Sequence, residues 1–440
     1  MKQVIITTLG CKVNQYESAA FHTAFAEAGY EVVKSGKEVA VVVINTCAVT
    51  SKAGAQSRQA VRQAIRKNPA ARIVITGCYA EIAAKELTNL EELSGRQYCI
   101  IGNSKKDQLV PVSISDDLGS QLLLGAIDSA TEICRLPVRH FGDRTRAYLR
   151  VQDGCESFCT YCIVPFTRGP SRSLPEDEVL QQARSFIEND FQEIVLTGIH
   201  LGQYGRDLNP SIDITRLLDR LSHATPTVRY RISSIEPTEI NKQLLTLMQT
   251  RDNIMPHLHI PLQSGDDEIL ARMNRKYTTA EFQRVVESCR EFLPDAAIGI
   301  DILAGFPGES DEQFLNTRNF LASLPCTYLH VFPYSRRPGT VAAGYKDEVK
   351  KHVKEERVAE LRALGDAKHD AFYQSQLGRT LPVLVEGRRD KEGLLQGFSS
   401  NYVSVHFHGD DNLKNRVVQV YLKEQNGPHI FGEVRNSNAS

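Results

Sequence analysis

Short hydrophobic runs rich in β-branched residues alternate with helix-like stretches through the first quarter of the chain. Four runs have this character: residues 4–8, 39–44, 72–76 and 98–101. Strands that alternate with helices form parallel sheets whose crossovers are covered by those helices. We therefore predict an α/β fold that begins with a parallel-sheet βαβ domain over residues 1–115. The periodicity is then lost, which predicts a linker over residues 116–140.

The same alternation resumes in the middle of the chain and continues for longer. Six further runs have the character of buried strands: residues 148–151, 193–196, 229–233, 257–260, 298–303 and 328–332. Helix starts between them are marked by capping patterns, among them Thr278 with Glu281 and Ser310 with Gln313. We predict a partial (β/α)6 barrel over residues 141–345, and in such barrels the loops at the carboxyl ends of the strands carry the chemistry.

The last part of the chain changes character twice. Residues 346–375 mix Lys, Arg, Asp and Glu evenly, which is typical of a bridging helix with a solvated face. Five short alternating runs then follow: residues 381–385, 394–397, 402–407, 417–422 and 429–434. We predict a small antiparallel β-barrel over residues 376–440. Barrels of this size often bind RNA through aromatic side chains, here Phe398, Tyr402, Phe407, Tyr421 and Phe431, although most of these rings are also suited to the core.

Composition limits the function without deciding it. The 440 residues include 52 Lys plus Arg and 53 Asp plus Glu, so net charge does not indicate a nucleic-acid partner. No apolar run approaches the roughly 18 residues of a membrane span, and Met1 to Gln3 lead into a strand and not into a secretory signal. We expect a cytoplasmic protein with no membrane contact. In a reducing compartment its ten cysteines are expected to be metal ligands or core residues and not disulfides.

Cys155, Cys159 and Cys162 lie in a short loop after the first strand of the predicted barrel. Thiolates select iron-sulfur clusters, zinc or copper, and structural zinc requires four ligands. This loop offers no fourth Cys or His at zinc spacing. Three ligands on a 4Fe-4S cluster leave one iron open to chelate S-adenosylmethionine, and an electron from the cluster then yields a 5′-deoxyadenosyl radical. We predict this radical chemistry, with a zinc site or a structural loop as the alternatives.

A second set of three cysteines follows three strands of the N-terminal sheet. Cys11, Cys47 and Cys78 each come directly after, or within two or three residues of, a predicted strand end. The carboxyl ends of parallel strands meet at one edge of the sheet, so the three thiols should converge there. We predict a second cluster that is also open at one iron. The alternative is that these are buried core cysteines.

The other strand-end loops of the predicted barrel are rich in Gly and polar residues. Gly198 and Gly305 would let the backbone approach the amine and adenine of S-adenosylmethionine, and Glu236 and Gln263 could accept hydrogen bonds from its ribose and ammonium. Each of these residues is equally consistent with an ordinary turn. His200, His257 and His259 are candidates for proton handling or polar lining, with structural histidines as the alternative.

Local basic charge suggests an RNA contact. Residues 51–72 contain no acidic residue, and Arg58, Arg62 and Arg66 repeat every four residues along one helical stripe. Like charges so placed repel one another, which favours phosphates as their partners. Several arginines between Arg135 and Arg172 surround the Cys155 loop in the same way. A solvated surface is the alternative for both groups.

Four motifs together resemble a known family. Residues 8–18 (Thr-Leu-Gly-Cys-Lys-Val-Asn-Gln-Tyr-Glu-Ser), residues 45–50 (Asn-Thr-Cys-Ala-Val-Thr), residues 76–78 (Thr-Gly-Cys) and the Cys155 loop are similar to those of the radical S-adenosylmethionine methylthiotransferases. The resemblance covers essentially the whole chain. It implies a methylthiotransferase domain, a radical barrel and a C-terminal TRAM domain in this order. It also implies an auxiliary 4Fe-4S cluster on Cys11, Cys47 and Cys78 and a radical 4Fe-4S cluster on Cys155, Cys159 and Cys162.

The motif Cys11-Lys-Val-Asn14 is most similar to that of the branch that modifies N6-threonylcarbamoyladenosine beside the anticodon of tRNA. In that family one S-adenosylmethionine methylates a sulfur at the auxiliary cluster and a second yields the radical that activates C2 of the adenine. The resemblance thus implies a tRNA anticodon stem-loop as substrate, a small electron-transfer protein such as flavodoxin or ferredoxin as partner, and a monomer. The alternatives are the same reaction on N6-isopentenyladenosine or on a ribosomal protein, and a non-enzymatic iron-sulfur RNA-binding protein.

Overall fold

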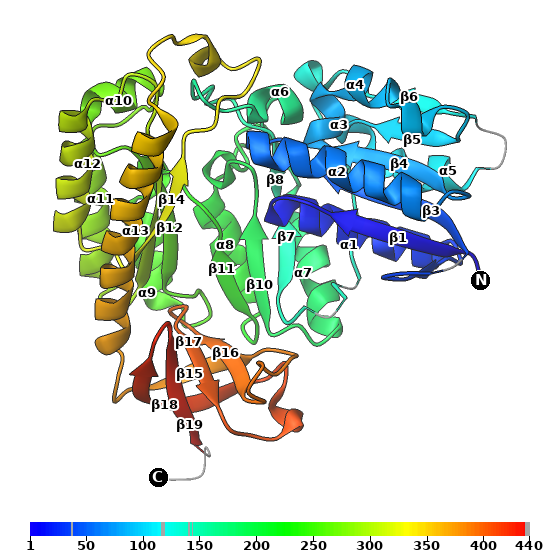
Figure 1. The fold of residues 1–440 in the computed structure, drawn as a ribbon. Helices are drawn as coiled ribbons and strands as arrows, with labels where there is room; N and C mark the ends of the chain where they lie inside the picture. The colour runs from blue at the N-terminus through cyan, green and yellow to red at the C-terminus, as the bar shows by residue number, and fades with distance from the viewer. Residues whose placement is uncertain (37, 116–118, 140, 143, 436–440) are drawn as a thin grey trace.

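The computed structural model describes residues 1–36, 38–115, 119–139, 141–142 and 144–435. Three modules follow one another along the chain (Figure 1): an N-terminal sheet covered by helices, a central partial barrel, and a small closed barrel at the C-terminus. In the part of the chain that is described, no helix is both long enough and apolar enough to cross a membrane.

The N-terminal module is a six-stranded parallel sheet with the order β2-β1-β3-β4-β5-β6. Its strands are β1 (Gln3–Thr8), β2 (Glu31–Val32), β3 (Val39–Thr46), β4 (Arg72–Gly77), β5 (Tyr98–Ile101) and β6 (Gln121–Leu123). Its helices are α1 (Lys12–Glu27), α2 (Ser51–Lys67), α3 (Cys78–Ile82), α4 (Ala84–Thr88) and α5 (Leu109–Ile114). The parallel sheet predicted from the sequence is therefore confirmed.

Strand β6 occupies part of the stretch that the sequence suggested as a linker. It pairs with β5, with Gln121 opposite Cys99 and Leu123 opposite Ile101. A strand of three residues at the edge of a sheet is too short to show a period of two, which is why the pattern did not reveal it. Residues 116–118 and 140 of the expected linker lie outside the described residues.

The central module contains all six predicted strands, every one of them parallel to its neighbours. They are β7 (Ala147–Arg150), β10 (Glu193–Thr197), β11 (Arg229–Ile232), β12 (His257–Gln263), β13 (Ala297–Ala304) and β14 (Tyr328–Pro333). Two three-stranded sheets, β11-β10-β7 and β12-β13-β14, are joined by two isolated parallel bridges, Tyr230 with Ile254 and Ser234 with His259. The result is a partial barrel, in agreement with the sequence.

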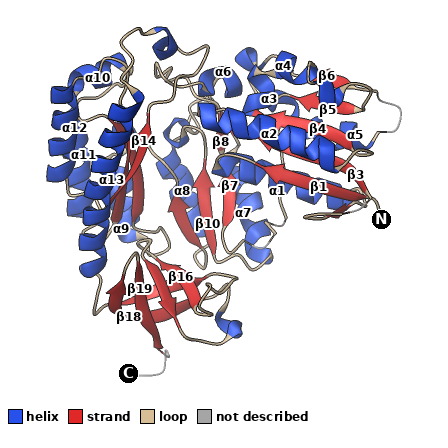
Figure 2. Ribbon diagram, viewed as in Figure 1, coloured by secondary structure: helices blue, strands red, loops and turns tan. Residues whose placement is uncertain are grey.

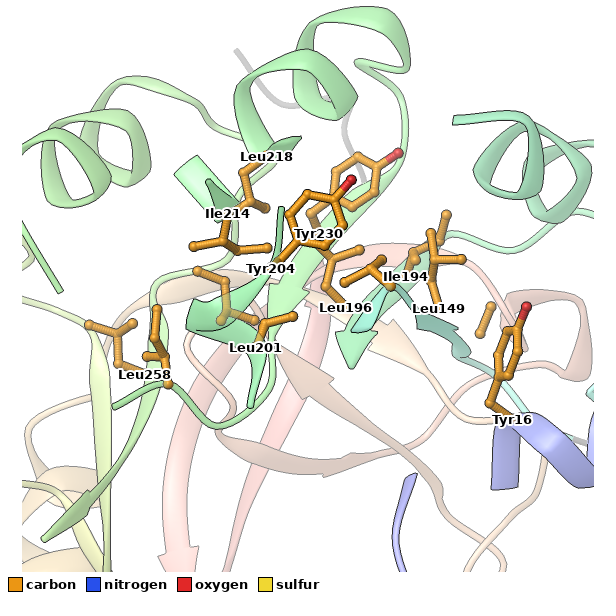
Figure 3. Close-up of a cluster of buried hydrophobic side chains, with 14 of the residues drawn as sticks. Tyr16, Leu149, Ile194, Leu196, Leu201, Tyr204, Ile214, Leu218, Tyr230 and Leu258 are labelled. Atoms are coloured by element: carbon orange, nitrogen blue, oxygen red, sulfur yellow. The ribbon is translucent and has the colours of Figure 1, made fainter. Parts of the chain in front are cut away.

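Helices cover the outer face of the partial barrel (Figure 2). They are α7 (Glu176–Glu188), α8 (Ile214–Ala224), α9 (Lys242–Thr250), α10 (Asp267–Arg272), α11 (Thr279–Phe292) and α12 (Asp311–Ser323). The capping boxes at Thr278 and Ser310 are both formed, as predicted. Ile214 and Leu218 of α8 pack toward the strand residues Leu196 and Tyr230 in a core that Tyr16 of α1 also joins (Figure 3).

The C-terminal module is a closed five-stranded barrel with the order β15-β16-β17-β19-β18. Its strands are β15 (Thr380–Val385), β16 (Leu395–Ser399), β17 (Ser404–Phe407), β18 (Val417–Asn426) and β19 (His429–Arg435). Four of the neighbouring pairs are antiparallel as expected, but β17 and β19 pair in parallel because β18 lies between them in the sequence and returns on the other side. The predicted bridging helix is α13 (Lys351–Gln374), which runs along β14 down to this barrel (Figure 1).

The C-terminal barrel docks on the starting ends of the central strands through a buried ion-pair network. Glu193 at the start of β10 accepts from Arg146 Nε at 3.0 Å and from Arg231 Nε at 2.9 Å. Arg146 also bonds Glu386 of the C-terminal barrel at 2.7 Å, and Arg231 donates to the Ser400 carbonyl at 3.1 Å. Glu193 therefore holds two arginines in the orientation that the docking requires.

We expect Glu193→Ala to destabilise the protein by about 3 kcal/mol at pH 7, because it leaves buried arginines without a counter-charge. Burial alone would raise the pKa of Glu193, but Arg231 and Arg146 lower it to about 2. A depressed folded-state pKa means that this stability is present above the ordinary value of 4.5 and is lost as the pH falls from there toward 2. Urea unfolding followed by circular dichroism would measure both effects, with the exposed Glu188→Ala as control. Equal urea midpoints for Glu193→Ala and Glu188→Ala would contradict the stabilising role of Glu193.

Candidate active site

The Cys155 loop lies at the carboxyl end of β7, between β8 (Gln152–Asp153) and α6 (Val164–Arg168). Cys155, Cys159 and Cys162 line one cavity of about 150 Å³ together with residues from the other strand ends. Gly154 before the loop has φ +81°, and a Cβ there would lie 1.9 Å from the Pro170 carbonyl oxygen. Only glycine fits this turn, so the backbone itself directs the loop into the cavity.

The pKa of Cys155 is lowered, whereas the pKa values of Cys159 and Cys162 are raised. His200 Nδ1 lies 3.4 Å from Cys155 Sγ, and His200 Nε2 lies 2.7 Å from Glu239. Burial would raise the pKa of Cys155, but the hydrogen bonds from His200 and Ser157 bring it below its ordinary value. Burial raises the pKa of Cys162 to about 12. His200, a candidate for proton handling from the sequence, is thus a partner of Cys155.

Arg275 is the main residue of this cavity that the sequence did not indicate. Its Nη1 lies 3.4 Å from Cys159 Sγ, and its Nη2 forms an ion pair with Glu236. Tyr277 accepts from Arg275 Nε at 2.9 Å. Arg275 comes from the turn after α10, which no strand-end pattern marks. A buried arginine beside a thiol supplies positive charge where an anionic cluster or a carboxylate would sit.

The four residues predicted to contact S-adenosylmethionine are placed in two groups. Glu236 and Gln263 line the cysteine cavity. Gly198 and Gly305 lie outside that lining. A Cβ at Gly198 would lie 2.8 Å from Gln152, and one at Gly305, where φ is +73°, would lie 2.2 Å from Lys354 of α13. Close packing against neighbouring side chains accounts for glycine at both positions.

The second cysteine set converges at the carboxyl edge of the N-terminal sheet. Cys11 caps α1 after β1, Cys47 follows β3, and Cys78 opens α3 after β4. These strands are neighbours in the order β1-β3-β4. A Cβ at Gly10 would lie 2.9 Å from Cys47 Sγ. Burial, together with the charges of Cys78 and Cys11, raises the pKa of Cys47 to about 11. The three thiols therefore form one group.

Arg168 joins the two cysteine sets. It is fully buried at the end of α6, and its Nε donates to Cys78 Sγ at 3.3 Å. Its Nη1 bonds Glu17 at 2.7 Å and Asp153 at 3.1 Å, and its Nη2 donates to Asn14 at 2.7 Å. Asp153 directly precedes the Cys155 loop, whereas Asn14 and Glu17 belong to α1. One guanidinium thus contacts a thiol of the auxiliary set and the segment that leads into the Cys155 loop.

This network corrects one expectation from the sequence. The arginines around the Cys155 loop were expected to attract phosphates, but Arg150, Arg168 and Arg172 are each less than 5% exposed. Their partners include Asp153, just before the loop, and Glu17 of α1, which is too distant in the sequence to be recognised as a neutralising charge.

The stripe Arg58, Arg62 and Arg66 lies on α2, as predicted, but it is not free of acids. Arg58 lies 3.7 Å from Glu86, and Arg62 and Arg66 each lie 3.5 Å from Glu92. The side chains remain 36%, 48% and 71% exposed respectively. The stripe can still contact an anion, with part of its charge already neutralised.

Both cysteine sets suit an iron-sulfur cluster by the chemistry of their donors. Each brings three sulfur atoms together, the number that holds three irons of a 4Fe-4S cluster and leaves one open. The cavity beside the Cys155 set offers Glu236, Gln263 and Arg275 for a ligand of that open iron.

Comparisons with known proteins agree with this site. A family model described as Uncharacterized protein family UPF0004 matches residues 3–95, and one described as Radical SAM superfamily matches residues 149–321. Among solved structures, the radical S-adenosylmethionine methyltransferase TsrM from Kitasatospora setae has a TM-score of 0.56 at 15% identity and covers 78% of this chain and 77% of its own. That likeness shows the fold.

Sequence relatives are nearer. The threonylcarbamoyladenosine tRNA methylthiotransferase MtaB of Bacillus subtilis (strain 168) is 38% identical, covering 98% of this chain and 96% of the relative. MtaB of Aquifex aeolicus (strain VF5) is 37% identical over 87% of this chain and 92% of its own. The tRNA-2-methylthio-N(6)-dimethylallyladenosine synthase of Thermoanaerobacter sp. (strain X514) is 31% identical over 98% of this chain and 92% of its own.

Fold and cysteine loop together define a radical S-adenosylmethionine enzyme, whose cofactors are S-adenosylmethionine and iron-sulfur clusters. Within that class the chain belongs to the tRNA methylthiotransferase family, which confirms the resemblance of its motifs.

We expect the two cysteine sets to bind iron independently. Replacing Cys155, Cys159 and Cys162 by Ala should remove about half of the iron and sulfide bound after anaerobic reconstitution, and replacing Cys11, Cys47 and Cys78 should remove the other half. Cys134→Ser, outside both sets, is the matched control and should retain full iron content. Loss of all iron on removing only one set would show that the sets are not separate sites.

Proposed function

We propose that this protein adds a methylthio group to C2 of N6-threonylcarbamoyladenosine next to the anticodon of tRNA, using two S-adenosylmethionine molecules and one 4Fe-4S cluster in each cysteine set. The observation that carries the proposal is that Arg168 contacts both Cys78 of one set and Asp153, two residues before Cys155 of the other. Relatives named for this reaction match almost the full length of the chain and support the choice of substrate.

Residues of the Cys155 cavity would bind the radical cluster and orient S-adenosylmethionine. Cys155, Cys159 and Cys162 would hold the cluster, which when bound would supply the electron for cleavage of S-adenosylmethionine. Glu236 and Gln263 line the same cavity and would orient the ribose and ammonium of this cosubstrate. Arg275 holds Glu236 in place through their ion pair. Burial raises the pKa of Glu236, and the charge of Arg275 opposes this shift.

The N-terminal module would hold the sulfur that is transferred. Asn14 donates to the Leu9 carbonyl at 2.8 Å and to the Thr46 carbonyl at 3.0 Å, which ties the Cys11 turn to the end of β3. Asn45 in turn donates to the Asn14 carbonyl at 3.0 Å. These contacts fix the turns of Cys11 and Cys47 relative to one another, as a cluster of defined geometry requires.

A second candidate substrate is N6-isopentenyladenosine in tRNA. Relatives named tRNA-2-methylthio-N(6)-dimethylallyladenosine synthase cover 98% of this chain at 31% identity. Because the isopentenyl group is apolar and the threonylcarbamoyl group carries a carboxylate, the two substrates require different surroundings for the N6 substituent.

Mass spectrometry of nucleosides from total tRNA would test the proposal. The chain is expressed in a host that lacks its own methylthiotransferases, beside the variant Cys155→Ala/Cys159→Ala/Cys162→Ala. We expect the methylthio derivative of threonylcarbamoyladenosine in the first strain and its absence in the second. If only the isopentenyl derivative appears, the substrate is N6-isopentenyladenosine instead. If no methylthio nucleoside appears although the clusters are intact, the proposal is overturned.

The α2 stripe is proposed as a contact for the tRNA backbone. We expect Arg58→Ala/Arg62→Ala/Arg66→Ala to weaken tRNA binding several-fold. The slope of log affinity against log salt concentration should become shallower by on the order of one. Three fully uncompensated arginines would give a larger change, but Glu86 and Glu92 already neutralise part of their charge. Filter binding at several salt concentrations measures this, with Arg184→Ala/Arg284→Ala as a control on other helices. An unchanged slope would remove the stripe from the interface.

A further inference from the structure

The loop after β14, residues 334–340, crosses from the central module to the start of α2 in the N-terminal module. Ser335 Oγ accepts a hydrogen bond from the Ser51 N–H at 2.9 Å. Ser51 Oγ in turn donates to the Arg336 carbonyl at 2.7 Å. These two bonds fix the loop on the first turn of α2.

Arg337 in this loop is a buried cation without a partner. It is 7% exposed, and its Nε is enclosed without a hydrogen-bond acceptor. No carboxylate of the described residues forms an ion pair with its guanidinium. Arg336, Pro338 and Gly339 around it are exposed, so the guanidinium lies close to solvent. A charge taken out of water is costly unless it is paired, which makes Arg337 a candidate to bind an anion.

Gly54 makes room for this guanidinium on α2. A Cβ at Gly54 would lie 3.5 Å from Arg337 Nη1 and 3.3 Å from the ring of Tyr79. Gly54 comes four residues before Arg58, so its position continues the α2 stripe toward the start of the helix. Positions four apart are separated by about 6 Å along a helix axis. Arg337 thus adds, from the central module, one more cation to the row of arginines on α2.

Positive charge along this extended row is greatest at the Arg337 end. Each arginine of the α2 stripe lies beside Glu86 or Glu92, whereas Arg337 has no acid beside it among the residues that the structure describes. The first turn of α2 also carries the positive end of the helix dipole. An anion would therefore be bound more strongly here than farther along the helix.

The Arg337 end of the row adjoins the auxiliary cysteines. Ser57 of α2 donates to the Cys47 carbonyl at 2.8 Å and accepts from the Cys47 N–H at 3.0 Å. Tyr79, whose ring borders the same space as Arg337, directly follows Cys78. A ligand on Arg337 would thus be held next to the edge of the sheet where the sulfur is to be transferred.

We propose that Arg337 binds a backbone phosphate of the RNA next to the target nucleotide, and that the α2 stripe follows the strand away from it. The inference rests on the proposed function and assigns the residue that positions the strand beside the auxiliary cysteines. A guanidinium suits this role because it donates two parallel hydrogen bonds to a phosphate. Phosphate contacts fix the register of a nucleic acid and carry no sequence information, so the selection of the base is left to other residues.

Neutral linkages in the RNA test this contact. The probes are anticodon stem-loops with threonylcarbamoyladenosine and one methylphosphonate linkage, placed on either side of the target nucleotide or in the stem. Fluorescence anisotropy gives their affinities for the cluster-loaded wild type. We expect one linkage beside the target to weaken binding about tenfold when it is neutral, because a charge-assisted hydrogen bond is lost. The stem linkage should have a smaller effect.

Arg337→Gln should show that this phosphate and this guanidinium are partners. We expect it to bind the stem-loop of natural backbone about tenfold more weakly than the wild type, and to lose nothing further with the methylphosphonate. Arg336→Gln is the matched control, since Arg336 is an exposed neighbour whose Nε already donates to the Ala343 carbonyl at 2.9 Å. It should keep the sensitivity of the wild type to the neutral linkage.

Iron content and the urea midpoint are measured on every variant. Arg337→Lys keeps a charge at the same position without the planar pair of donors, and it replaces Arg337→Gln if that variant does not fold. We expect Arg337→Lys to be less sensitive to the neutral linkage than the wild type.

Three results would overturn the proposal. The first is additive losses from Arg337→Gln and the methylphosphonate. The second is an equal loss of affinity in Arg336→Gln and Arg337→Gln, which would show a general effect of charge. The third is unchanged RNA affinity in Arg337→Gln with an altered electron paramagnetic resonance spectrum of the auxiliary cluster, recorded with the Cys155 loop replaced by its triple-alanine variant. That result would assign Arg337 to an anion at the cluster.

Binding and product formation separate this inference from the proposed function. A methylthio product on threonylcarbamoyladenosine in cells, together with additive losses, defeats only the phosphate contact. Losses that do not add, together with no methylthio nucleoside in cells, support the contact and defeat the proposed reaction.

Discussion

The buried ion network around Arg168 is the constraint on which the rest of the structure depends. Arg168, Glu17 and Lys106 are almost completely excluded from solvent, and Lys106 Nζ lies 2.5 Å from Glu17. Removing charges from water is costly, and only close pairing with satisfied hydrogen bonds offsets that cost. Glu17 comes from α1, Lys106 from the segment after β5, and Arg168 from α6 of the central module. The N-terminal module and the barrel must therefore meet in one arrangement, and that arrangement sets the two cysteine sets beside one another.

Sheet topology explains why the cysteines could be placed from the sequence. In both modules the strands are parallel, so every strand ends at one edge, and a cysteine just after a strand must lie there. Cys47 after β3 and Cys78 after β4 follow this rule in the first module, and Cys155 follows it in the second. The rule needs only strand positions, which long β-branched runs such as residues 39–44 make plain.

Pairing between distant residues explains what the sequence could not reveal. Glu86 and Glu92, the acids that pair with the α2 stripe, lie beyond the next strand in the sequence. The sequence pattern therefore predicted a stripe of uncompensated positive charge. The sequence likewise predicted that Arg168 belongs to a basic surface, because its partner Glu17 is in another module. Arg275 comes from a turn without any motif. Short-range patterns give the period of an element but not the identity of the side chains that oppose it.

Aromatic residues of the C-terminal barrel serve packing, both inside the barrel and against the central module. Its aromatic residues suggested RNA contacts, yet Phe407 is buried in the core of the module, and Phe398 stacks on Tyr402 at 4.8 Å. Tyr402 has φ +67°, a conformation that non-glycine residues seldom adopt, and its ring contacts His257 and Arg231 of the central module. Backbone strain of this kind persists only where surrounding contacts determine it. The contacts of Tyr402 with His257 and Arg231 thus help to hold the third module against the second.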